Sequence, residues 1–249
     1  MNSMPWKPQQ FRLTVFPSKA FDVPEPGWWI KLLGELPEEK SIKSKGLSQF
    51  ESGKFREGRL DLSTSAARID WTYSAQVSGE DEPDLSTGIP TLGSFEASLA
   101  DFRALADRWL KEMCPPVSRI AFGAVLLHPA GSHEQGYELL QHYLPRLEID
   151  PKGSFDFLYQ INRPRVSKSG IPDFRINRLS KWAVVKPQAH IFTAGKSITM
   201  DMGDFATRLE LDLSTQQNFE GDLPVEKVPS IFDELVTLGG EIASLGDVP

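Results

Sequence analysis

The stretch Arg208-Leu209-Glu210-Leu211 repeats the pattern of Arg68-Ile69-Asp70-Trp71, in which apolar residues alternate with charged ones. Alternation with a period of two predicts a strand that has one buried face and one solvent-facing side. Each stretch is the last predicted strand before a long amphipathic helix. We therefore read residues 1–114 and 115–249 as two tandem units, each a strand, a helix, several strands and a closing helix, in one fused globular domain.

The first unit opens with apolar residues that alternate over residues 11–15, which predicts a half-buried strand. Large apolar residues then recur at helical spacing over residues 28–36. The pattern returns to a period of two over residues 46–75, and residues 79–93 are rich in acids, Pro and Gly, which predicts a surface loop. Apolar residues along one face of residues 94–113 predict the closing helix.

The second unit begins with a nearly continuous apolar run over residues 120–127, which predicts a central strand buried on both faces. Ser132, followed by Gln135 three residues later, is typical of a capped helix start. The remaining predicted elements are strands at 155–161, 174–185 and 209–213, a hairpin at 189–202 and a last helix at 225–245.

Strands and helices with one apolar side each can hide those sides if the helices cover one face of a sheet. The sequence predicts an α+β protein in which two strand-helix-meander-helix repeats form a curved antiparallel sheet with helices packed on one face. The opposite, polar face is then left open. Phe102, Trp109, Phe232 and Leu235 lie on the apolar sides of the closing helices, so we expect them in the core.

The order of elements resembles the half-domain of the TATA-binding-protein-like fold, which also occurs as a tandem pair. That resemblance concerns the fold, and the DNA-binding function of the family does not follow from it. Three segments also resemble a sporadically distributed family of uncharacterised bacterial proteins: Arg119-Ile120-Ala121-Phe122-Gly123, residues 209–215 and residues 231–235. This second resemblance implies a bacterial accessory protein, of the kind found in toxin–antitoxin or phage-defence loci.

The composition indicates the cellular compartment in which we expect the protein. The chain has 249 residues, of which 40% are apolar, and a net charge of −7. Its longest apolar run, residues 120–127, is far shorter than the roughly 20 residues that a membrane helix needs. The single cysteine, Cys114, has no partner for an internal disulfide. We expect a cytoplasmic protein with no membrane association. The sequence does not predict an oligomeric state.

Motifs for catalysis are sparse. The four histidines do not have the spacing of a helical zinc site, and we expect no metal, no cofactor and no catalytic residue. Two acid pairs, Glu148 with Asp150 and Glu210 with Asp212, have the alternating spacing that brings carboxylates together on a strand. Any solvated strand produces such pairs, so an enzyme of unrecognised type is the least favoured of three hypotheses.

The distribution of charge is more informative than any motif. Residues 162–198 contain eight Lys or Arg and the single acid Asp173, which makes this meander locally basic in an acidic chain. The predicted binding residues are Arg163, Arg165, Lys168, Arg175, Arg178 and Lys181. The alternative is that acidic neighbours in space balance these charges. A second basic meander lies in the first unit, between Lys40 and Arg59.

We therefore favour a non-catalytic binding protein that acts through protein contacts, as an antitoxin, immunity or phage-defence accessory factor. The second hypothesis is a nucleic-acid or nucleotide binder that uses the basic meander, although a net charge of −7 opposes general nucleic-acid affinity. Trp71, Tyr159 and Trp182 are its candidate stacking groups if they are exposed.

Overall fold

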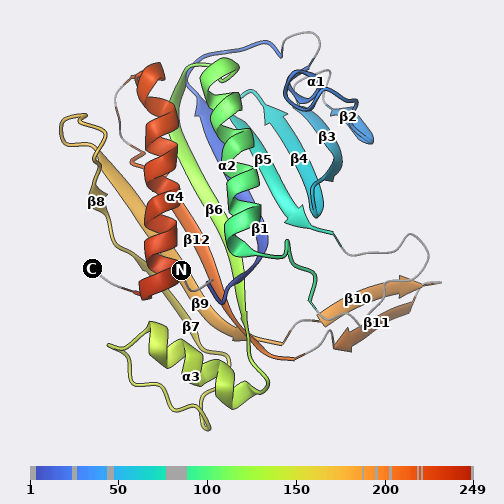
Figure 1. Cartoon of the computed structure of the whole chain (residues 1–249), viewed down its shortest axis with the longest axis vertical. Helices are drawn as coiled ribbons and strands as arrows, with labels where there is room; N and C mark the ends of the chain where they lie inside the picture. The colour runs from blue at the N-terminus through green and yellow to red at the C-terminus, as the bar shows by residue number, and fades with distance from the viewer. Residues whose placement is uncertain are drawn as a thin grey trace.

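The computed structural model describes residues 4–23, 27–43, 48–76, 89–186, 188–193, 196–201, 204–217, 219 and 221–247. In this part of the chain, a ten-stranded antiparallel sheet and four α-helices make up the main body (Figure 1). The predicted α+β class and antiparallel sheet are confirmed.

The elements of the first half are β1 (Lys7–Pro17), α1 (Trp28–Leu33), β2 (Glu39–Lys43), β3 (Ser48–Phe55), β4 (Gly58–Ser65), β5 (Arg68–Ala75) and α2 (Phe95–Glu112). Those of the second half are β6 (Val117–Pro129), α3 (His133–Tyr143), β7 (Leu158–Asn162), β8 (Arg165–Val166), β9 (Arg175–Val185), β10 (Gln188–Thr193), β11 (Lys196–Asp201), β12 (Ala206–Thr215) and α4 (Val228–Leu245). A short 3-10 helix, Val225–Lys227, leads into α4.

The strands of the main sheet lie in the order β2-β3-β4-β5-β1-β6-β12-β9-β7, with β8 paired to β9. The first strand of each half, β1 and β6, pair antiparallel at the centre of the sheet, with Leu13 opposite Phe122. The last strand of each half lies next to it, β5 beside β1 and β12 beside β6. β10 and β11 form a separate two-stranded sheet that projects from the body (Figure 1).

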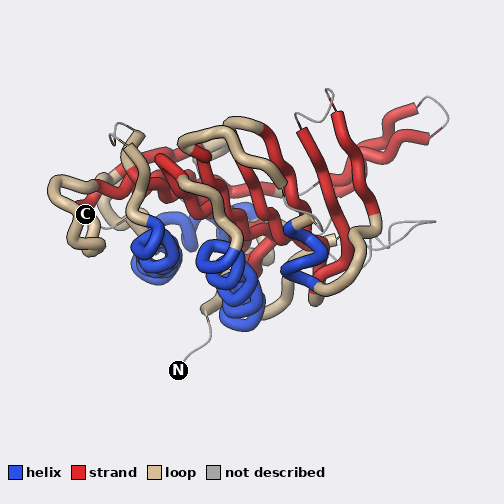
Figure 2. The backbone as a smooth tube through the Cα atoms, turned by 90° about the horizontal axis from the view of Figure 1, so that it is seen from above, coloured by secondary structure: helices blue, strands red, loops and turns tan. Residues whose placement is uncertain are grey.

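The helices cover one face of the main sheet. Figure 2 shows them together on one side of the strands, and α2 and α4 contact each other while they cross β1 and β6. Helix α1 packs beside α2, and α3 contacts β9 and β12 at one end of the sheet. No described helix lies on the opposite face.

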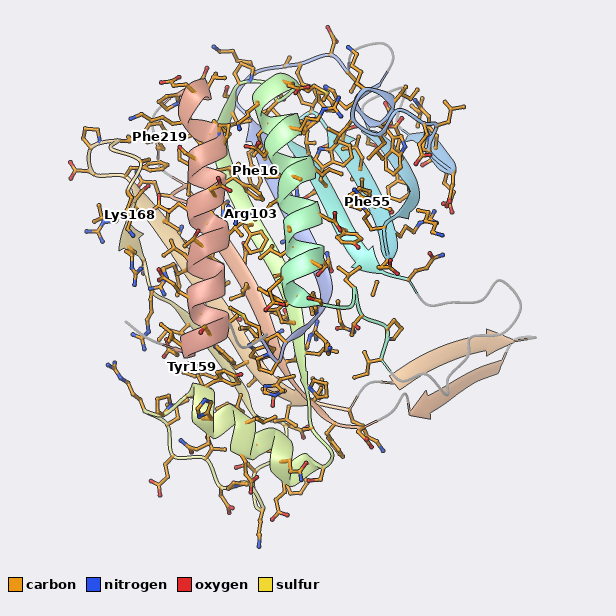
Figure 3. The ribbon with its side chains drawn as sticks, viewed as in Figure 1. Phe16, Phe55, Arg103, Tyr159, Lys168 and Phe219 are labelled. Atoms are coloured by element: carbon orange, nitrogen blue, oxygen red, sulfur yellow. The ribbon has the colours of Figure 1, made fainter. Side chains whose placement is uncertain are left out.

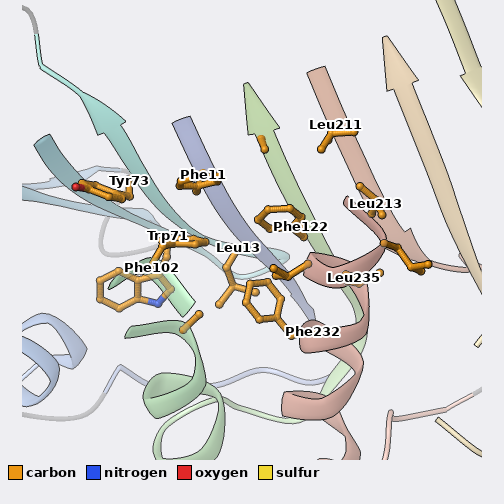
Figure 4. Close-up of a cluster of buried hydrophobic side chains, with 14 of the residues drawn as sticks. Phe11, Leu13, Trp71, Tyr73, Phe102, Phe122, Leu211, Leu213, Phe232 and Leu235 are labelled. Carbon is orange, nitrogen blue, oxygen red and sulfur yellow. The ribbon is translucent and has the colours of Figure 1, made fainter. Parts of the chain in front are cut away.

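The core fills the space between α2, α4 and the sheet (Figure 4). Phe102 of α2 stacks on Phe11 with ring centroids 5.9 Å apart, and Phe232 of α4 meets Phe122 edge-on at 6.0 Å. Trp109 and Leu235 are fully buried as well. All four predicted core residues of the closing helices are confirmed.

Most predicted elements are present. The helices α2, α3 and α4 lie where the sequence predicts them, and Ser132 caps α3 by accepting a hydrogen bond from Gln135 N at 3.2 Å. The hairpin of β10 and β11 is confirmed. The loop predicted at residues 79–93 lies largely outside the described residues.

Two predicted boundaries are wrong. The first helix ends at Leu33 instead of residue 36, because Gly34 adopts a left-handed conformation with φ of 80° and leaves Leu36 exposed. The strand predicted at 155–161 begins only at Leu158, and Phe155 is 71% exposed in the preceding turn. Strand β2 has no apolar alternation and was not predicted; it forms at the edge of the sheet by pairing with β3.

Candidate functional site

The candidate site is the face of the main sheet that the described helices leave open. Side chains alternate along each strand, so Phe11, Leu13 and Val15 point toward the helices while their neighbours on β1 point to the open face. The strand register places Arg12 of β1, Gly123 of β6 and Asp212 of β12 side by side in one row. We call this the Arg12 row.

Small outward residues on β6 leave space above the backbone of this strand on the open face. Ala121 and Gly123 are the outward residues at the middle of this central strand, so little side chain rises above its backbone. Two adjoining hollows, with volumes of about 290 and 590 Å³, open on this face and share Leu179 and Asp212. We refer to them together as the sheet groove.

The open face is more basic than the chain as a whole. On the five strands β5, β1, β6, β12 and β9, the outward positions carry seven cations and three acids. The cations are Lys7, Arg12, Arg68, Arg119, Arg175, Lys181 and Arg208, and the acids are Asp70, Glu210 and Asp212. The result is a local excess of positive charge in a protein of net charge −7.

Two of the three acids are neutralised by neighbours. Asp70 accepts hydrogen bonds from Arg68 Nε at 2.6 Å and Arg68 Nη2 at 2.8 Å, and this pairing raises the pKa of Arg68. Glu210 forms ion pairs with Arg208 at 3.0 Å and with Lys181 at 3.5 Å. These pairs leave Arg12, Arg119 and Asp212 as the charges of the groove with no ion pair to any described residue.

The side chain of Arg12 has no hydrogen-bond partner among the described residues, and its Nε is buried. Its guanidinium lies over Gly123: a Cβ atom added there would be 3.3 Å from Arg12 Nη2. Arg119 instead stacks on the ring of Phe16, with its Cζ 4.9 Å from the centroid, and donates from Nη2 to Ser214 Oγ at 2.9 Å. Guanidinium groups held in this way are suited to bind carboxylates or phosphates.

Amide side chains line much of the sheet groove. They come from β1, β7, β9 and the residues that follow β12: Gln10, Gln160, Asn162, Asn177, Gln216 and Gln217. Asn162 Nδ2 donates to Asn177 Oδ1 at 3.1 Å, and Asn162 Oδ1 accepts from the backbone N of Arg178 at 2.9 Å. Each amide offers both a donor and an acceptor, so the groove can satisfy a ligand that carries both.

The six predicted binding residues do not form one surface. Arg175 and Lys181 lie on the open face of β9. Arg178, three residues from Arg175, points to the other face. Arg178 is only 2% exposed, and this burial lowers its pKa. Arg178 is therefore not exposed for binding, and the prediction that it is a binding residue on the surface is wrong.

Arg163, Arg165 and Lys168 lie on the helix side, next to α4. Arg165 Nη1 is 2.9 Å from Glu241 Oε2, and Glu234 Oε1 accepts from the backbone N of Lys168 at 2.8 Å. Figure 3 shows Lys168 beside β8, next to α4.

Arg163 is held by the segment that follows α4. Its Nε and Nη2 donate to Asp247 at 2.5 and 2.7 Å, and Tyr159 donates to the same carboxylate at 2.9 Å. The hydrogen bonds from Arg163 lower the pKa of Asp247, although burial opposes the shift. We call these contacts the Asp247 latch, which joins the end of α4 to the edge of the sheet.

The other predicted features are placed as follows. Trp71 and Trp182 are fully buried, so they offer no stacking surface. In the first basic meander, Lys40 pairs with Glu51 at 3.0 Å, and Arg59 pairs with Glu39 at 2.6 Å. Lys40 and Arg59 are thus paired with acids of the same chain, whereas the exposed Lys54 has no ion pair to any described residue.

No catalytic constellation is evident in the described residues. They contain no group of three or more His, Cys, Asp or Glu that could hold a metal ion. Glu148 and Asp150 lie in a loop and not on a strand, which removes the geometric basis for pairing them. The described part of the chain has no helix that is long and apolar enough to span a membrane.

Sequence reasoning missed Arg12, Gly123 and Arg119 as members of one site. The alternation around residues 11–15 identifies Arg12 as an outward residue, but only the pairing of both β1 and β12 with β6 places Arg12 and Asp212 in one row. No known protein-family model matches the chain, and no curated protein matches its sequence.

Proposed function

We propose that the protein is a non-catalytic binding protein that acts through protein contacts and uses the open face of its sheet. The observation that supports this most directly is the Arg12 row. In this row, the side chain of Arg12 has no described hydrogen-bond partner and lies above Gly123, which has no side chain to fill the space. The surrounding groove is lined by amide side chains. Arg163 and Arg165, in contrast, are already paired with acids of the same chain.

The biological setting we propose is that of a bacterial accessory factor in the cytoplasm, such as an antitoxin, an immunity protein or a phage-defence component. The resemblance of three segments to uncharacterised bacterial proteins motivates this setting. A stoichiometric protein partner is what each of these roles requires.

We further propose that residues 1–114 and 115–249 are tandem units related by a pseudo-twofold axis, which together form a curved sheet like that of the TATA-binding-protein-like fold. The symmetric strand order around the β1–β6 pair supports this. Superposing the units should bring Ile69 and Trp71 onto Leu209 and Leu211. A superposition that places these pairs on different strands would exclude the repeat.

The experiment that tests the function is affinity purification from the organism that encodes the chain, with identification of what binds in stoichiometric amount. The wild type is compared with a double variant, Arg12→Gln with Arg175→Gln, which neutralises two open-face cations. Lys168→Gln is the matched control, because Lys168 is exposed on the helix side. We expect the partner to be lost only with the double variant. Loss with Lys168→Gln alone would assign binding to the α4 side instead.

The excess of cations on the open face also supports the second function, binding of a nucleic acid or nucleotide. Phosphate contacts release counterions, so such binding should weaken steeply as salt rises from 50 to 200 mM. Recovery of nucleic acid, sensitive to salt and to the open-face variant, would favour this function over protein contacts.

A further inference from the structure

We propose that the partner presents an extended peptide segment with carboxylate side chains, which lies in the sheet groove along β6 and β12. This inference rests on the proposed function of the open face as a protein-binding surface. It adds the chemistry and the conformation of the segment that is bound.

The shape of the groove suits an extended chain. One hollow includes Gln10 and Val125, and the other includes Arg119 and Gln216, so the groove follows the direction of β6. Residues 119 to 125 span on the order of 20 Å in a strand, because each residue rises about 3.3 Å. About six residues of an extended peptide fit this length.

The lining favours a peptide backbone over a phosphate backbone. Every peptide group presents a donor and an acceptor, and each amide side chain along the groove presents both kinds of group as well. The carbonyl oxygens of Asn162, Asn177 and Gln216 already accept hydrogen bonds within the protein. Phosphates present acceptors only, so the side-chain carbonyl oxygens of Gln10 and Gln160, which have no donor among the described residues, would find none on the phosphates of a phosphodiester chain. The groove contains hydrogen-bond donors, acceptors and charges of both signs, whereas a polyanion needs a uniformly positive surface.

The arginines favour acidic side chains on that peptide. The guanidinium group of Arg12 lies above Gly123 of β6, and that of Arg119 reaches from β6 to Ser214 of β12. A carboxylate can accept two hydrogen bonds from one guanidinium group. Alternate residues of an extended peptide face the same way, about 7 Å apart, so two acids at alternating positions can reach the two arginines.

Asp212 also restricts which charges the bound peptide can carry. It lies in the Arg12 row and forms no ion pair with any described residue. A carboxylate directly opposite Asp212 would be repelled, whereas a Lys, Gln or Ser at that inward position would not. The preferred segment therefore combines acids with at least one neutral or basic inward residue.

The test uses an array of immobilised decapeptides in which Glu, Gln, Lys or Ser occupies each alternating position. We expect the full chain to be retained by peptides with two Glu at inward positions and Gln or Lys at another. Retention without enrichment of Glu would overturn the proposal, as would strongest retention by all-Glu peptides.

Fluorescence anisotropy with the best peptide from the array then tests the residues. Arg12→Gln should weaken binding about tenfold, which corresponds to about 1.4 kcal/mol, and Asp212→Asn should increase the affinity of the all-Glu peptide. Lys168→Gln should leave affinity unchanged. Equal affinity for wild type and Arg12→Gln, or displacement of the peptide by single-stranded DNA, would overturn the assignment.

The two proposals can fail separately. If Arg12→Gln with Arg175→Gln loses a co-purified protein while no array peptide is retained, the open face binds a protein but not an extended acidic segment. If the double variant retains the partner, the proposed function itself is wrong.

Discussion

The guanidinium group of Arg12 lies directly over Gly123, so that a Cβ atom at position 123 would come within 3.3 Å of Arg12 Nη2. The three heavy atoms nearest to such a Cβ atom all belong to the guanidinium group of Arg12, which is the far end of a flexible side chain. A larger residue at 123 should therefore displace Arg12 and fill the groove without disturbing the sheet.

We predict that Gly123→Val abolishes partner binding while the free energy of unfolding changes by no more than about 1 kcal/mol. Urea denaturation and the affinity purification described above measure the two effects. A variant that unfolds much more easily would show that Gly123 serves packing, and retained binding would show that the groove is not the contact surface.

Trp109 should be among the most sensitive core positions. It is fully buried and meets Trp28 edge-on at 5.5 Å and Trp71 at 6.1 Å, so it joins α2 to α1 and the sheet. Trp109→Ala should lower the free energy of unfolding by about 3–5 kcal/mol. Thermal denaturation followed by circular dichroism measures the change, and an unshifted melting curve would contradict the packing of α2.

Two adjacent glycines of α4 should respond in opposite directions. A Cβ atom at Gly240 meets nothing within 4 Å, so Gly240→Ala should stabilise the helix by about 0.5–1 kcal/mol. A Cβ atom at Gly239 would lie 3.0 Å from Phe122 Cε1 and 3.4 Å from Leu211 Cδ1, so Gly239→Ala should destabilise. Denaturant midpoints of the two variants provide the comparison, and equal shifts would rule out the close fit of α4 on β6 and β12.

The Asp247 latch should make stability depend on acid pH. Because Arg163 lowers the pKa of Asp247 in the folded state, the stabilisation is fully present above about pH 4, where the unfolded carboxyl is also ionised. It should be lost as the pH falls further and the folded carboxyl becomes protonated. Asp247→Asn removes the charge at every pH.

The wild type should therefore be more stable than Asp247→Asn at pH 7, and the difference should shrink below pH 4. Urea denaturation at several pH values measures this difference. A difference that stays constant down to pH 2.5 would mean that the latch acts by packing and not by charge.

Cys114 should react slowly with thiol reagents in the native protein. Burial raises the pKa of its thiol to about 12, so the reactive thiolate is scarce at neutral pH. Reaction with a disulfide reagent at pH 8 should be much slower in buffer than in urea. Equal rates would contradict the burial of this thiol.

Much of the fold could be predicted because each element has a clear apolar side. The steps of four and three along α2, with Phe102 and Trp109 on one face, are enough to identify the helix and its core residues. Strand β2 could not be predicted this way, because an edge strand can form by hydrogen bonds to a neighbour without an apolar pattern of its own.

The candidate site was harder to predict because it depends on register. Arg12, Gly123 and Asp212 are far apart in sequence, and each looks ordinary alone. The cluster between Arg163 and Lys181 stands out by composition, yet its members are divided between two faces of β9 and the side of α4. Local charge counts do not show which acids of α4 and its C-terminal extension approach these residues in space.

The hairpin of β10 and β11 has a consequence for how the fold could change. Val185 at the end of β9 pairs directly with Ala206 at the start of β12. The chain therefore leaves the main sheet and returns to it at two residues that lie directly opposite each other. The gap is about one strand spacing, roughly 4.8 Å, which a tight turn can close. The hairpin is therefore a modular insertion: replacing residues 186–205 with a two-residue turn should preserve the register of the sheet, and the same position can accept a label or a fused domain.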